Sequence, residues 1–597
     1  MGWNSPSELV RGNLVPSVLV FVLTALVFGA AVRYGMCFCD DSVYLTNNPV
    51  MDGLTVKGIV FAFTDVAQCI WMPFTYLTYM LDCGMGWGFG GMHAQSIAWH
   101  ALNAALLYLL LFRLFGSRFA AFAGALLWSV HPLRVESVVW IASRKDVTSA
   151  FFLILGLHAW LSGGTSNRKW IALAFVLFLL GALAKPSIMV FPAFVLALDF
   201  LITGERKHPG VYGLAVGISA VLALFSGNIQ NVGGAGEVSS YIPLLYRLLN
   251  ALASVTVYLG NTVWPADLGV QCMIRYPDPP RFSATGTVLL GLIVLWVSVV
   301  LLPRVRDFLK DRDPERLLRG EASDNVLLAG FGIFFCSLVP FLGVAGFGYH
   351  AFADRFTILP SIGLSVLACH LIARHGTIFL RAISLGVLAA IAWRGHVQTG
   401  YWESNEKLML HTLEVDRDRN AEMHMSLGVY YWEYGHDMEK VYEHCRKARD
   451  YTFFPTRMDH FLSMSHFFIE ACYETGHDEE ADDCYYLFRK YDYHQHQEEG
   501  RSVEFLMADL LWTLHSGREN AIAEAEDILR RSERTFPNFY ITANMAYQIA
   551  RARGDREGIR KALERCASVK WTGVYCNCTW AKDMLRDFDR EQKGKGI

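Results

Sequence analysis

Charged side chains are scarce in this chain of 597 residues. Only 18% are Asp, Glu, Lys or Arg, against roughly 25% in ordinary soluble proteins, so the composition excludes a single soluble globular domain. The net charge of −3 and the lack of a basic stripe argue against a nucleic-acid-binding protein. Disorder is excluded as well, because 53% of the residues are hydrophobic and 13% are aromatic.

The scarcity of charge is confined to the first two thirds of the chain. Residues 1–400 hold 26 Lys and Arg against 20 Asp and Glu, which gives +6, whereas residues 401–597 hold 27 against 36, which gives −9. Two physically different regions therefore share one chain. We predict a domain at 1–399 and a second at 400–597.

Apolar stretches recur through the first region. A helix needs about 20 mostly apolar residues to cross a hydrocarbon core of about 30 Å. The predicted spans are 14–32, 93–112, 118–132, 147–163, 170–184, 187–203, 211–226, 286–303, 325–343, 355–373 and 377–394. The first is too long for a signal peptide and lacks a cleavage pattern, so we interpret it as an anchor. The fold class is therefore all-α, a polytopic membrane helix bundle of about eleven spans.

The Lys and Arg residues set the predicted orientation, because cytoplasmic loops carry an excess of positive charge. With the N-terminus inside, the basic positions at 113–118, 168–169, 206–207 and 304–319 are all cytoplasmic, provided that 240–264 does not cross. That apolar segment then lies in, or re-enters, the outer interface. The tail and both long loops, 33–91 and 227–285, fall on the outer side. In the first loop, 53–64 and 71–81 are expected to form amphipathic helices at the membrane surface.

The tail contains four related segments, each centred on a glycine: Gly435, Gly476, Gly517 and Gly554, spaced by 41, 41 and 37 residues. Each glycine follows an aromatic-rich helical stretch and precedes an acidic start, which predicts a helix, a glycine cap and a second helix. The first segment, HMSLGVYYWEYG, carries the Leu-Gly-x-x-Tyr signature of tetratricopeptide repeats. A solenoid of helix pairs offers a concave surface for a peptide or protein; an irregular helical bundle is the alternative.

Two adjacent carboxylates, Asp40 and Asp41, follow the first predicted span. Paired acids at the outer end of a span can provide a general base, or hold a divalent metal beside a phosphate. Mg²⁺ or Mn²⁺ would suit such a pair, although no third ligand is evident. The alternative is a solvated helix end with ordinary acids.

A second charged cluster lies in HPLRVESVVWIASRKD, a short outer connection between two predicted spans. It contains His131, Arg134, Glu136, Arg144, Lys145 and Asp146. Arginine and lysine here can bind a phosphate or pyrophosphate. The alternative is that these cations extend to lipid headgroups.

Further polar and aromatic residues are predicted at the same outer face. They are Lys185, Asp354, Arg355, Trp71 and His93. Ionisable groups near membrane depth are energetically costly and are functional candidates by default. Acids, phosphate-binding cations and aromatic rings are therefore expected to converge beneath the repeat domain, an arrangement suited to a polar group presented on a lipid phosphate.

These motifs resemble the GT-C class of membrane glycosyltransferases, and within it the transmembrane-and-tetratricopeptide-repeat O-mannosyltransferases and their bacterial relatives. The matching elements are DDSVYLTNNP, WMPFTY with MLD, HALN, HPLRVESVVWIASRKD, ADRFTILPSIGL and the YW that opens the tail. They occur in family order over nearly the whole chain. The bacterial-type form is the more similar, because HP-x-x-x-E-S-x-x-W-x-x-x-RKD is complete.

The resemblance implies an enzyme that moves mannose or another hexose from a polyprenyl-phosphate donor to Ser or Thr of a protein. Asp40 or Asp41 would be the catalytic base of an inverting displacement. From charge alone, we predict that Arg144, Lys145, Lys185 and Arg355 neutralise the donor phosphate. The supporting residues would be those at 71, 93, 131, 136, 146 and 354.

Several expectations depend on this resemblance. The enzyme is expected in a bacterial inner membrane, with its active site and tail facing the periplasm and the tail binding the acceptor protein. In two places the chain departs from the family pattern: Cys37-Phe38-Cys39 replaces the usual Asn-Tyr before the acids, and the repeat tail is short and irregular. The alternatives are a non-catalytic scaffold or secretion factor, and a GT-C transferase that acts on a lipid or polysaccharide.

Overall fold

The computed structural model describes residues 6–594 apart from several short segments, and it divides into two units. The segments left out are 38–39, 42–43, 46–47, 49, 67–69, 233–241, 271, 275, 277, 312–320, 345–349, 452–457, 496–502, 538 and 569–578. The first unit, here called the bundle unit, comprises Met1–Cys37 and Val50–Ser404. The second, the helix-pair unit, comprises Phe38–Pro49 and Asn405–Ile597.

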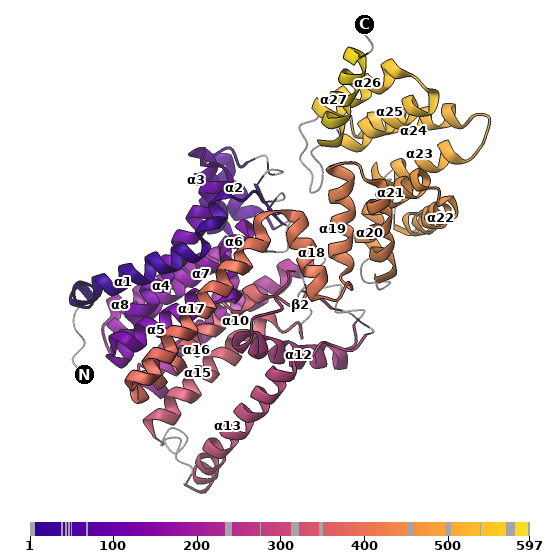
Figure 1. Ribbon diagram of the computed structural model, residues 1–597. Helices are drawn as coiled ribbons and strands as arrows, with labels where there is room; N and C mark the ends of the chain where they lie inside the picture. The colour runs from indigo at the N-terminus through magenta and orange to yellow at the C-terminus, as the bar shows by residue number, and fades with distance from the viewer. Residues whose placement is uncertain are drawn as a thin grey trace. The chain divides into compact units, whose positions relative to one another are not determined.

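The bundle unit is helical almost throughout its described residues (Figure 1). Its elements, with η marking short 3₁₀ or π turns, are α1 (Pro6–Phe28), η1 (Gly29–Arg33), α2 (Val56–Thr64), α3 (Pro73–Gly84), α4 (Gly88–Phe115), α5 (Arg118–Ser129), η3 (Pro132–Arg134), α6 (Val135–Val139), η4 (Ile141–Ser143), α7 (Arg144–Ser162), α8 (Arg168–Ala184), η5 (Pro186–Val190), α9 (Phe191–Leu196), η6 (Ala197–Thr203), α10 (Pro209–Val232), α12 (Leu244–Val263), β1 (Cys272–Met273), α13 (Ala284–Asp311), α15 (Ala322–Leu338), η7 (Val339–Phe341), β2 (His350–Phe352), η8 (Asp354–Thr357), α16 (Pro360–His375), α17 (Ile378–Gly400) and η9 (Tyr401–Glu403). The strands β1 and β2 pair antiparallel.

The all-α, polytopic fold class is confirmed. Every predicted span is a helix, and seven helices within the described residues are long and apolar enough to cross a membrane: Leu9–Arg33, Gly88–Phe115, Pro186–Thr203, Pro209–Asn231, Ala284–Asp311, Ala322–Phe341 and Ile378–Glu403. The four remaining predictions correspond to α5, α7, α8 and α16. Three of these helices have 12, 17 and 16 residues, and α7 begins with three charged residues.

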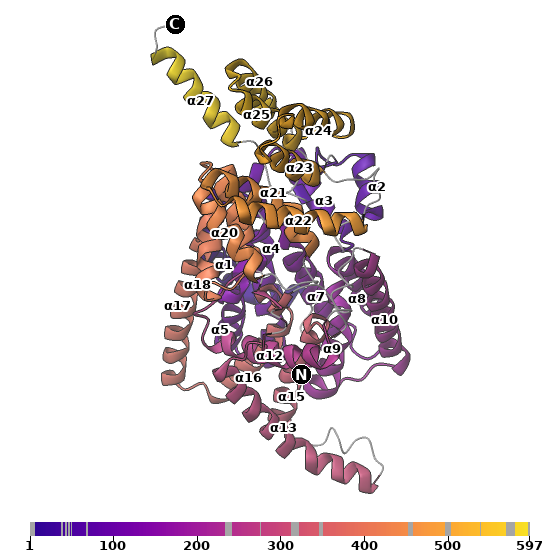
Figure 2. The same cartoon turned by 90° about the vertical axis from the view of Figure 1, so that its right-hand side faces the viewer.

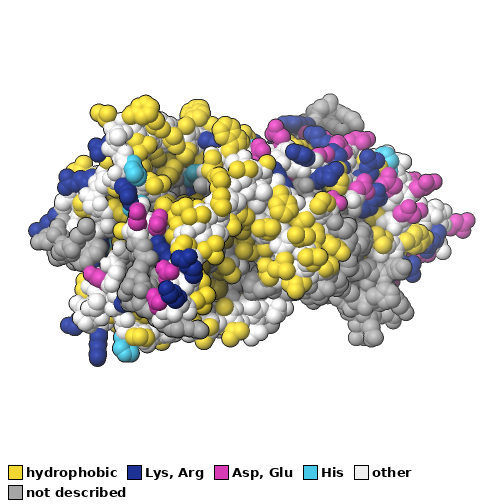
Figure 3. Space-filling view, turned by 90° about the horizontal axis from the view of Figure 1, so that it is seen from below, with side chains coloured by type: hydrophobic (Ala, Val, Ile, Leu, Met, Phe, Trp, Pro, Cys, Tyr) yellow, Lys and Arg dark blue, Asp and Glu magenta, His cyan; other side chains and the backbone are white. Residues whose placement is uncertain are grey.

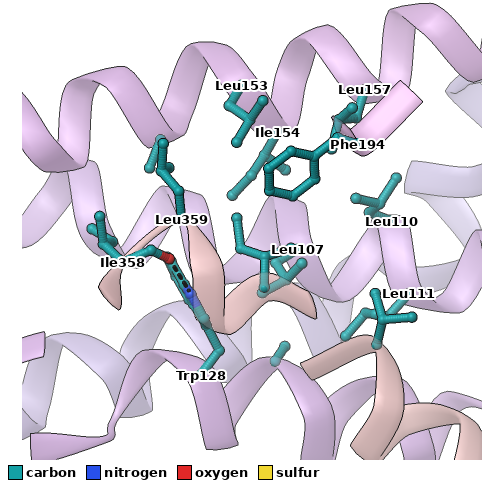
Figure 4. Close-up of a cluster of buried hydrophobic side chains, with 14 of the residues drawn as sticks. Leu107, Leu110, Leu111, Trp128, Leu153, Ile154, Leu157, Phe194, Ile358 and Leu359 are labelled. Carbon is teal, nitrogen blue, oxygen red and sulfur yellow. Dashed lines mark hydrogen bonds between the residues drawn. The ribbon is translucent and has the colours of Figure 1, made fainter. Parts of the chain in front are cut away.

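The helices pack around a core of aliphatic and aromatic side chains. Leu107, Leu110, Leu153 and Leu157 meet there from α4 and α7 (Figure 4). The indole Nε1 of Trp128 donates to the carbonyl of Ile358, directly after η8, at 2.9 Å. The outer surface is also apolar, and Figure 3 shows hydrophobic side chains over much of one face of this unit. A unit that is hydrophobic inside and outside is expected of a protein surrounded by lipid.

The helix-pair unit contains the predicted helix–glycine–helix segments. Its helices are α18 (Asn405–Val415), α19 (Ala421–Glu433), α20 (Met438–Tyr451), α21 (Met458–Thr475), α22 (Asp478–Gln495), α23 (Val503–His515), α24 (Ala521–Thr535), α25 (Tyr540–Arg553), α26 (Arg556–Ser568) and α27 (Thr579–Gly594). All four glycines have a positive φ, between 68° and 107°. They lie between α19 and α20, α21 and α22, α23 and α24, and α25 and α26, at turns that favour glycine over residues with a Cβ.

Successive helix pairs are stacked. The first helices of the pairs contact one another in the order α19, α21, α23 and α25. At the N-terminus of α19, the first of these helices, the side chain of the N-cap residue Asn420 accepts a hydrogen bond from the Met423 amide. Such stacking gives the unit its own hydrophobic core. The assignment of these pairs to the tetratricopeptide class stays a prediction.

Candidate functional site

A set of buried ionic groups lies inside the bundle unit, on the connections between α3, α5, α7, α8 and α16. The charged members are Asp82, Arg134, Glu136, Arg144, Lys145, Asp146, Lys185, Asp354 and Arg355, and all are buried. We call this set the ionic cluster. Seven of its nine members were predicted as site residues from the sequence.

Arg144 begins α7 and forms an ion pair with Asp82 of α3, with 2.6 Å between Nη1 and Oδ2 and neither side chain exposed. Its guanidinium also donates to the Ser96 hydroxyl at 3.2 Å and to the carbonyl of Met92 at 2.8 Å. The ring of Tyr79 lies 4.7 Å from the guanidinium carbon. Arg144 thus joins α7 to α3 and α4, and protein acceptors already surround its donors.

Lys185 pairs with Asp146, with 2.5 Å between Nζ and Oδ1. The lysine ends α8 and the aspartate lies in the first turn of α7. The ammonium also lies 5.6 Å from the Phe341 ring and 5.7 Å from the Phe356 ring, and these two rings stack with centroids 4.5 Å apart. The second oxygen of Asp146, Oδ2, is buried and has no hydrogen-bond partner in the part of the chain that the structure describes.

Glu136 holds Arg355 through both its side chain and its backbone. The Arg355 amide donates to Oε2 at 2.8 Å, and Nη1 donates to Oε1. The guanidinium lies 4.9 Å from the Phe356 ring and 5.2 Å from the Trp140 ring. Lys185 and Arg355 therefore both lie against the same aromatic ring, that of Phe356.

Asp354 lies beside these groups and outside the seven candidate spans. Burial and the nearby Glu136 raise the pKa of Asp354 well above its usual value, whereas Arg134, Arg355 and a hydrogen bond from Asn261 oppose the rise. The ammonium of Lys145 donates to the carbonyl of Ala142 in η4 at 2.7 Å.

The predicted supporting residues hold backbone segments in place. His131 accepts from the Leu133 amide at 3.2 Å and meets the Thr262 carbonyl at 3.0 Å. His93 Nε2 lies 3.1 Å from the carbonyl at 35, and the Trp71 indole donates to the carbonyl at 63, at 3.0 Å. These contacts join η3 to α12, α4 to the end of the first span, and α2 to the segment before α3.

The two predicted catalytic acids lie in a short segment that groups with the helix-pair unit. Asp41 is 1% exposed, and Asp40 is half-buried. The predicted convergence of these acids with the cations stays a prediction. The described residues contain no group of three or more His, Cys, Asp or Glu side chains placed to hold a metal ion.

Two members of the network, Asp82 and Asn261, were not predicted, and Arg134 was placed in the charged connection at 131–146 without an assigned role. Asp82 is the counter-ion of Arg144, Arg134 donates through Nη2 to the Thr357 hydroxyl, and Asn261 bonds to Asp354. The signal for Asp82 was present, because an acid within an apolar helical segment requires a partner. The partners at 261 and 357 are neutral residues far away in sequence, and no local pattern distinguishes them.

Comparison with known proteins supports the resemblance found in the motifs. The model of the dolichyl-phosphate-mannose-protein mannosyltransferase family matches residues 86–230. The human protein O-mannosyl-transferase TMTC4 is 22% identical over 464 residues, covering 65% of this chain and 60% of the human protein. The Caenorhabditis elegans protein O-mannosyl-transferase F38B6.6 is 22% identical over 471 residues, covering 74% and 64%. The predicted resemblance to the protein O-mannosyltransferases is confirmed.

The match to this family has a limited extent. The chain spans about three fifths of the length of these curated relatives, and mouse TMTC1 is 29% identical over 168 residues, or 26% of this chain. No solved structure matches the chain. Together with the seven apolar helices, the family match identifies a multi-pass membrane protein. Its bacterial origin and its orientation stay predictions.

Proposed function

We propose that the chain is a protein O-glycosyltransferase. It transfers mannose or another hexose from a polyprenyl-phosphate donor to Ser or Thr hydroxyls of a protein on the outer side of the membrane. The observation that carries this proposal is the family match over residues 86–230. That stretch contains the connection with Arg144 and Lys145, as well as Lys185 at the end of α8.

The charge of the ionic cluster supports an anionic ligand. It contains five cations, at 134, 144, 145, 185 and 355, and four carboxyl groups, at 82, 136, 146 and 354. The sum is +1 when all are ionised, and it is more positive when Asp354, whose pKa is raised, holds a proton. An excess of buried positive charge is energetically costly unless an anion compensates it. The phosphate of a lipid-linked sugar would provide that anion.

Within the cluster, Lys185 and Arg355 are the most suitable donor-binding cations. They flank the Phe356 ring from two different segments, and each has one carboxylate as its main ionic partner. Arg144 is already surrounded by acceptors from α3 and α4. We infer that it shapes the site and that the other two neutralise the leaving phosphate.

The proposed reaction is a single displacement with Asp41 or Asp40 as the base. The carboxylate takes the proton of the acceptor hydroxyl while the hydroxyl oxygen forms a bond to the anomeric carbon. The bond from that carbon to the phosphate oxygen breaks, and the phosphate leaves with the electron pair. Attack opposite the leaving group inverts the anomeric configuration. A phosphate leaving group requires charge neutralisation more than protonation, so one base suffices.

The helix-pair unit would bind the acceptor protein. Stacked helix pairs form extended surfaces that suit a peptide or an unfolded segment. The sugar, the acceptor and any Mg²⁺ or Mn²⁺ requirement belong to this proposal.

Mass analysis of outer and secreted proteins from cells with and without the gene tests the proposal. We expect Ser- or Thr-containing peptides to lose a hexose-sized mass when the gene is deleted, and to regain it when the wild-type gene is returned. A gene carrying Asp52→Asn, which alters an exposed acid of the same loop, serves as the matched control for one carrying Asp41→Asn. Unchanged protein masses, or a hexose lost only from a lipid or polysaccharide, would contradict it.

A further inference from the structure

The N-terminal and C-terminal halves of helix α12 have different surroundings. Leu244, Leu245, Leu248, Leu249 and Leu252 form a row that is between 42% and 69% exposed. From position 253 to position 260 every residue is buried. The N-terminal half therefore presents an uncharged leucine face, whereas the C-terminal half is enclosed by the bundle unit.

The enclosed half of α12 contacts the ionic cluster and the strand that precedes it. The hydroxyl of Tyr258 accepts from the Ala353 amide at 3.1 Å, and the hydroxyl of Ser254 donates to the Ala351 carbonyl at 2.7 Å. One turn later, Asn261 bonds to Asp354, as described above. The carbonyl oxygen of Thr262 lies 3.0 Å from Nε2 of His131, the residue before η3. One helix thus fixes both β2 and the start of η8.

The enclosed half of α12 packs against a helix that is long and apolar enough to span a membrane. The α12 helix packs directly on α13, where a Cβ at Gly286 would lie 1.6 Å from the Thr256 carbonyl oxygen. The α13 helix is one of the seven candidate spans, and its apolar side chains, including Leu292 and Leu295, are mostly exposed. The α12 helix itself is not among those spans. It runs across the direction of α15, α16 and α17 in Figure 1, and in Figure 2 it lies low and near the centre of the bundle unit, whereas α17 stands upright at the left edge.

We propose that the leucine face of α12 contacts the bilayer at the boundary between headgroups and acyl chains, and that this contact positions Ala353 and Asp354. An amphipathic helix without charges on its apolar face buries that face in this boundary region. Soluble surfaces rarely expose contiguous leucines to this extent. The polar opposite face then holds η8, and with it Arg355, at a fixed place relative to the membrane surface.

Photo-crosslinking of the full chain in phosphatidylcholine vesicles tests the lipid contact. A benzoylphenylalanine replaces Leu245 or Leu248 in turn, with Leu295 in α13 as the lipid-facing control and Leu410, an exposed leucine of the helix-pair unit, as the control outside the membrane. We expect phospholipid adducts at 245 and 248 comparable to those at 295 and well above those at 410. Adducts no higher than at 410, or crosslinks to a second chain or to the helix-pair unit, would overturn the assignment.

Hydrogen exchange in the same vesicles tests the positioning role without depending on enzymatic activity. We expect the double variant Leu245→Ser/Leu248→Ser to raise exchange at 353–357 several-fold while α5 stays protected, and Leu295→Ser to leave 353–357 unchanged. Tyr258→Phe removes the hydrogen bond to Ala353, so it should raise exchange there even with the lipid adducts retained. Unchanged exchange in Tyr258→Phe, or equal increases throughout the bundle unit in the double variant, would contradict the proposal.

Discussion

In the bundle unit buried carboxyl groups lie against cations, whereas in the helix-pair unit the buried Glu470 lies among neutral donors. Among the described residues of the bundle unit, four ion pairs have both side chains buried: Asp82 with Arg144, Glu136 with Arg355, Asp146 with Lys185, and Asp199 with Lys207. Glu470 instead accepts from the Trp432 indole at 3.0 Å and from the Gln548 amide at 2.7 Å.

This difference shows two ways of placing an acid away from water. A buried charge is costly, so the group either acquires a counter-ion or keeps its proton. In the bundle unit four buried carboxyl groups each have a cation as partner, and we propose that an anionic donor binds in this environment. In the helix-pair unit burial raises the pKa of Glu470 from its ordinary value of 4.5 to about 8. The Glu470 carboxyl group therefore keeps its proton at neutral pH and acts as a neutral hydrogen-bonding group in the core of that unit.

The largest expected effect follows from removing the proposed base. Asp41→Asn cannot accept the hydroxyl proton, so glycosyl transfer should fall by about 10²–10⁴-fold, the usual contribution of a general base. The measurement is the initial rate of peptide glycosylation by the purified full chain. Asp52→Asn, at an exposed acid, should keep the wild-type rate. Comparable rates in both variants would remove Asp41 from the mechanism.

Separating an ion pair of the bundle unit should reduce its stability. Lys185→Met leaves the Asp146 carboxylate buried without its cation, which typically costs about 3–5 kcal/mol. The double variant Lys185→Met/Asp146→Leu should recover most of that loss, yet remain inactive because the donor-binding cation is gone. Resistance of the full chain to denaturant in micelles measures this, with the exposed Lys57→Met as control. An equal loss in the single and double variants would contradict a paired role.

The helix-pair unit should respond to pH through Glu470. Its pKa is higher in the folded than in the unfolded chain, so between pH 4.5 and 8 the unfolded chain loses a proton that the folded chain retains. The free energy of unfolding should therefore fall as the pH rises, by about 1.4 kcal/mol per pH unit at most. Hydrogen exchange in α19, α21 and α25, corrected for intrinsic rates, measures this slope. Glu470→Gln should abolish it, and an unchanged slope would refute the assignment.

The smallest effect concerns glycines in the two units. Gly554 ends α25 with a φ of +68°, whereas Gly386 lies within α17 at an ordinary helical angle, and a Cβ would meet nothing within 4 Å at either position. Gly554→Ala should destabilise the helix-pair unit by about 1 kcal/mol. Gly386→Ala should be neutral or slightly stabilising, because alanine favours helices. Equal effects on local hydrogen exchange would show that backbone conformation does not determine the cost at position 554.

Much of this architecture follows from local patterns in the sequence. Apolar runs located the spanning helices, and the spacing of Gly435, Gly476, Gly517 and Gly554 located the helix pairs, because hydrophobic length and glycine caps act within a few residues. The charged connection at 131–146 was likewise evident, because ionisable groups between apolar helices are energetically costly and therefore indicate a structural or functional role.

Long-range pairing could not be predicted in the same way. Arg355 meets Glu136 across 219 residues, and Tyr258 meets the Ala353 amide across 95. Such contacts depend on how helices pack, and the sequence does not specify which carboxylate faces which cation. The same limit applies to Asp82, whose helix was predicted although its partnership with Arg144 was not.

The central claim, sugar transfer from a lipid phosphate to a protein hydroxyl, is tested most directly with purified full-length protein in vesicles. The vesicles would contain a synthetic polyprenyl-phosphate mannose of defined anomeric configuration, and a Ser/Thr-rich peptide would be supplied outside. The account predicts a mannosylated peptide whose linkage, determined by NMR, is inverted relative to the donor, and a rate about 10²–10⁴-fold lower with Asp41→Asn. A product with retained configuration, or no transfer to peptide by wild-type protein that remains folded, would contradict it.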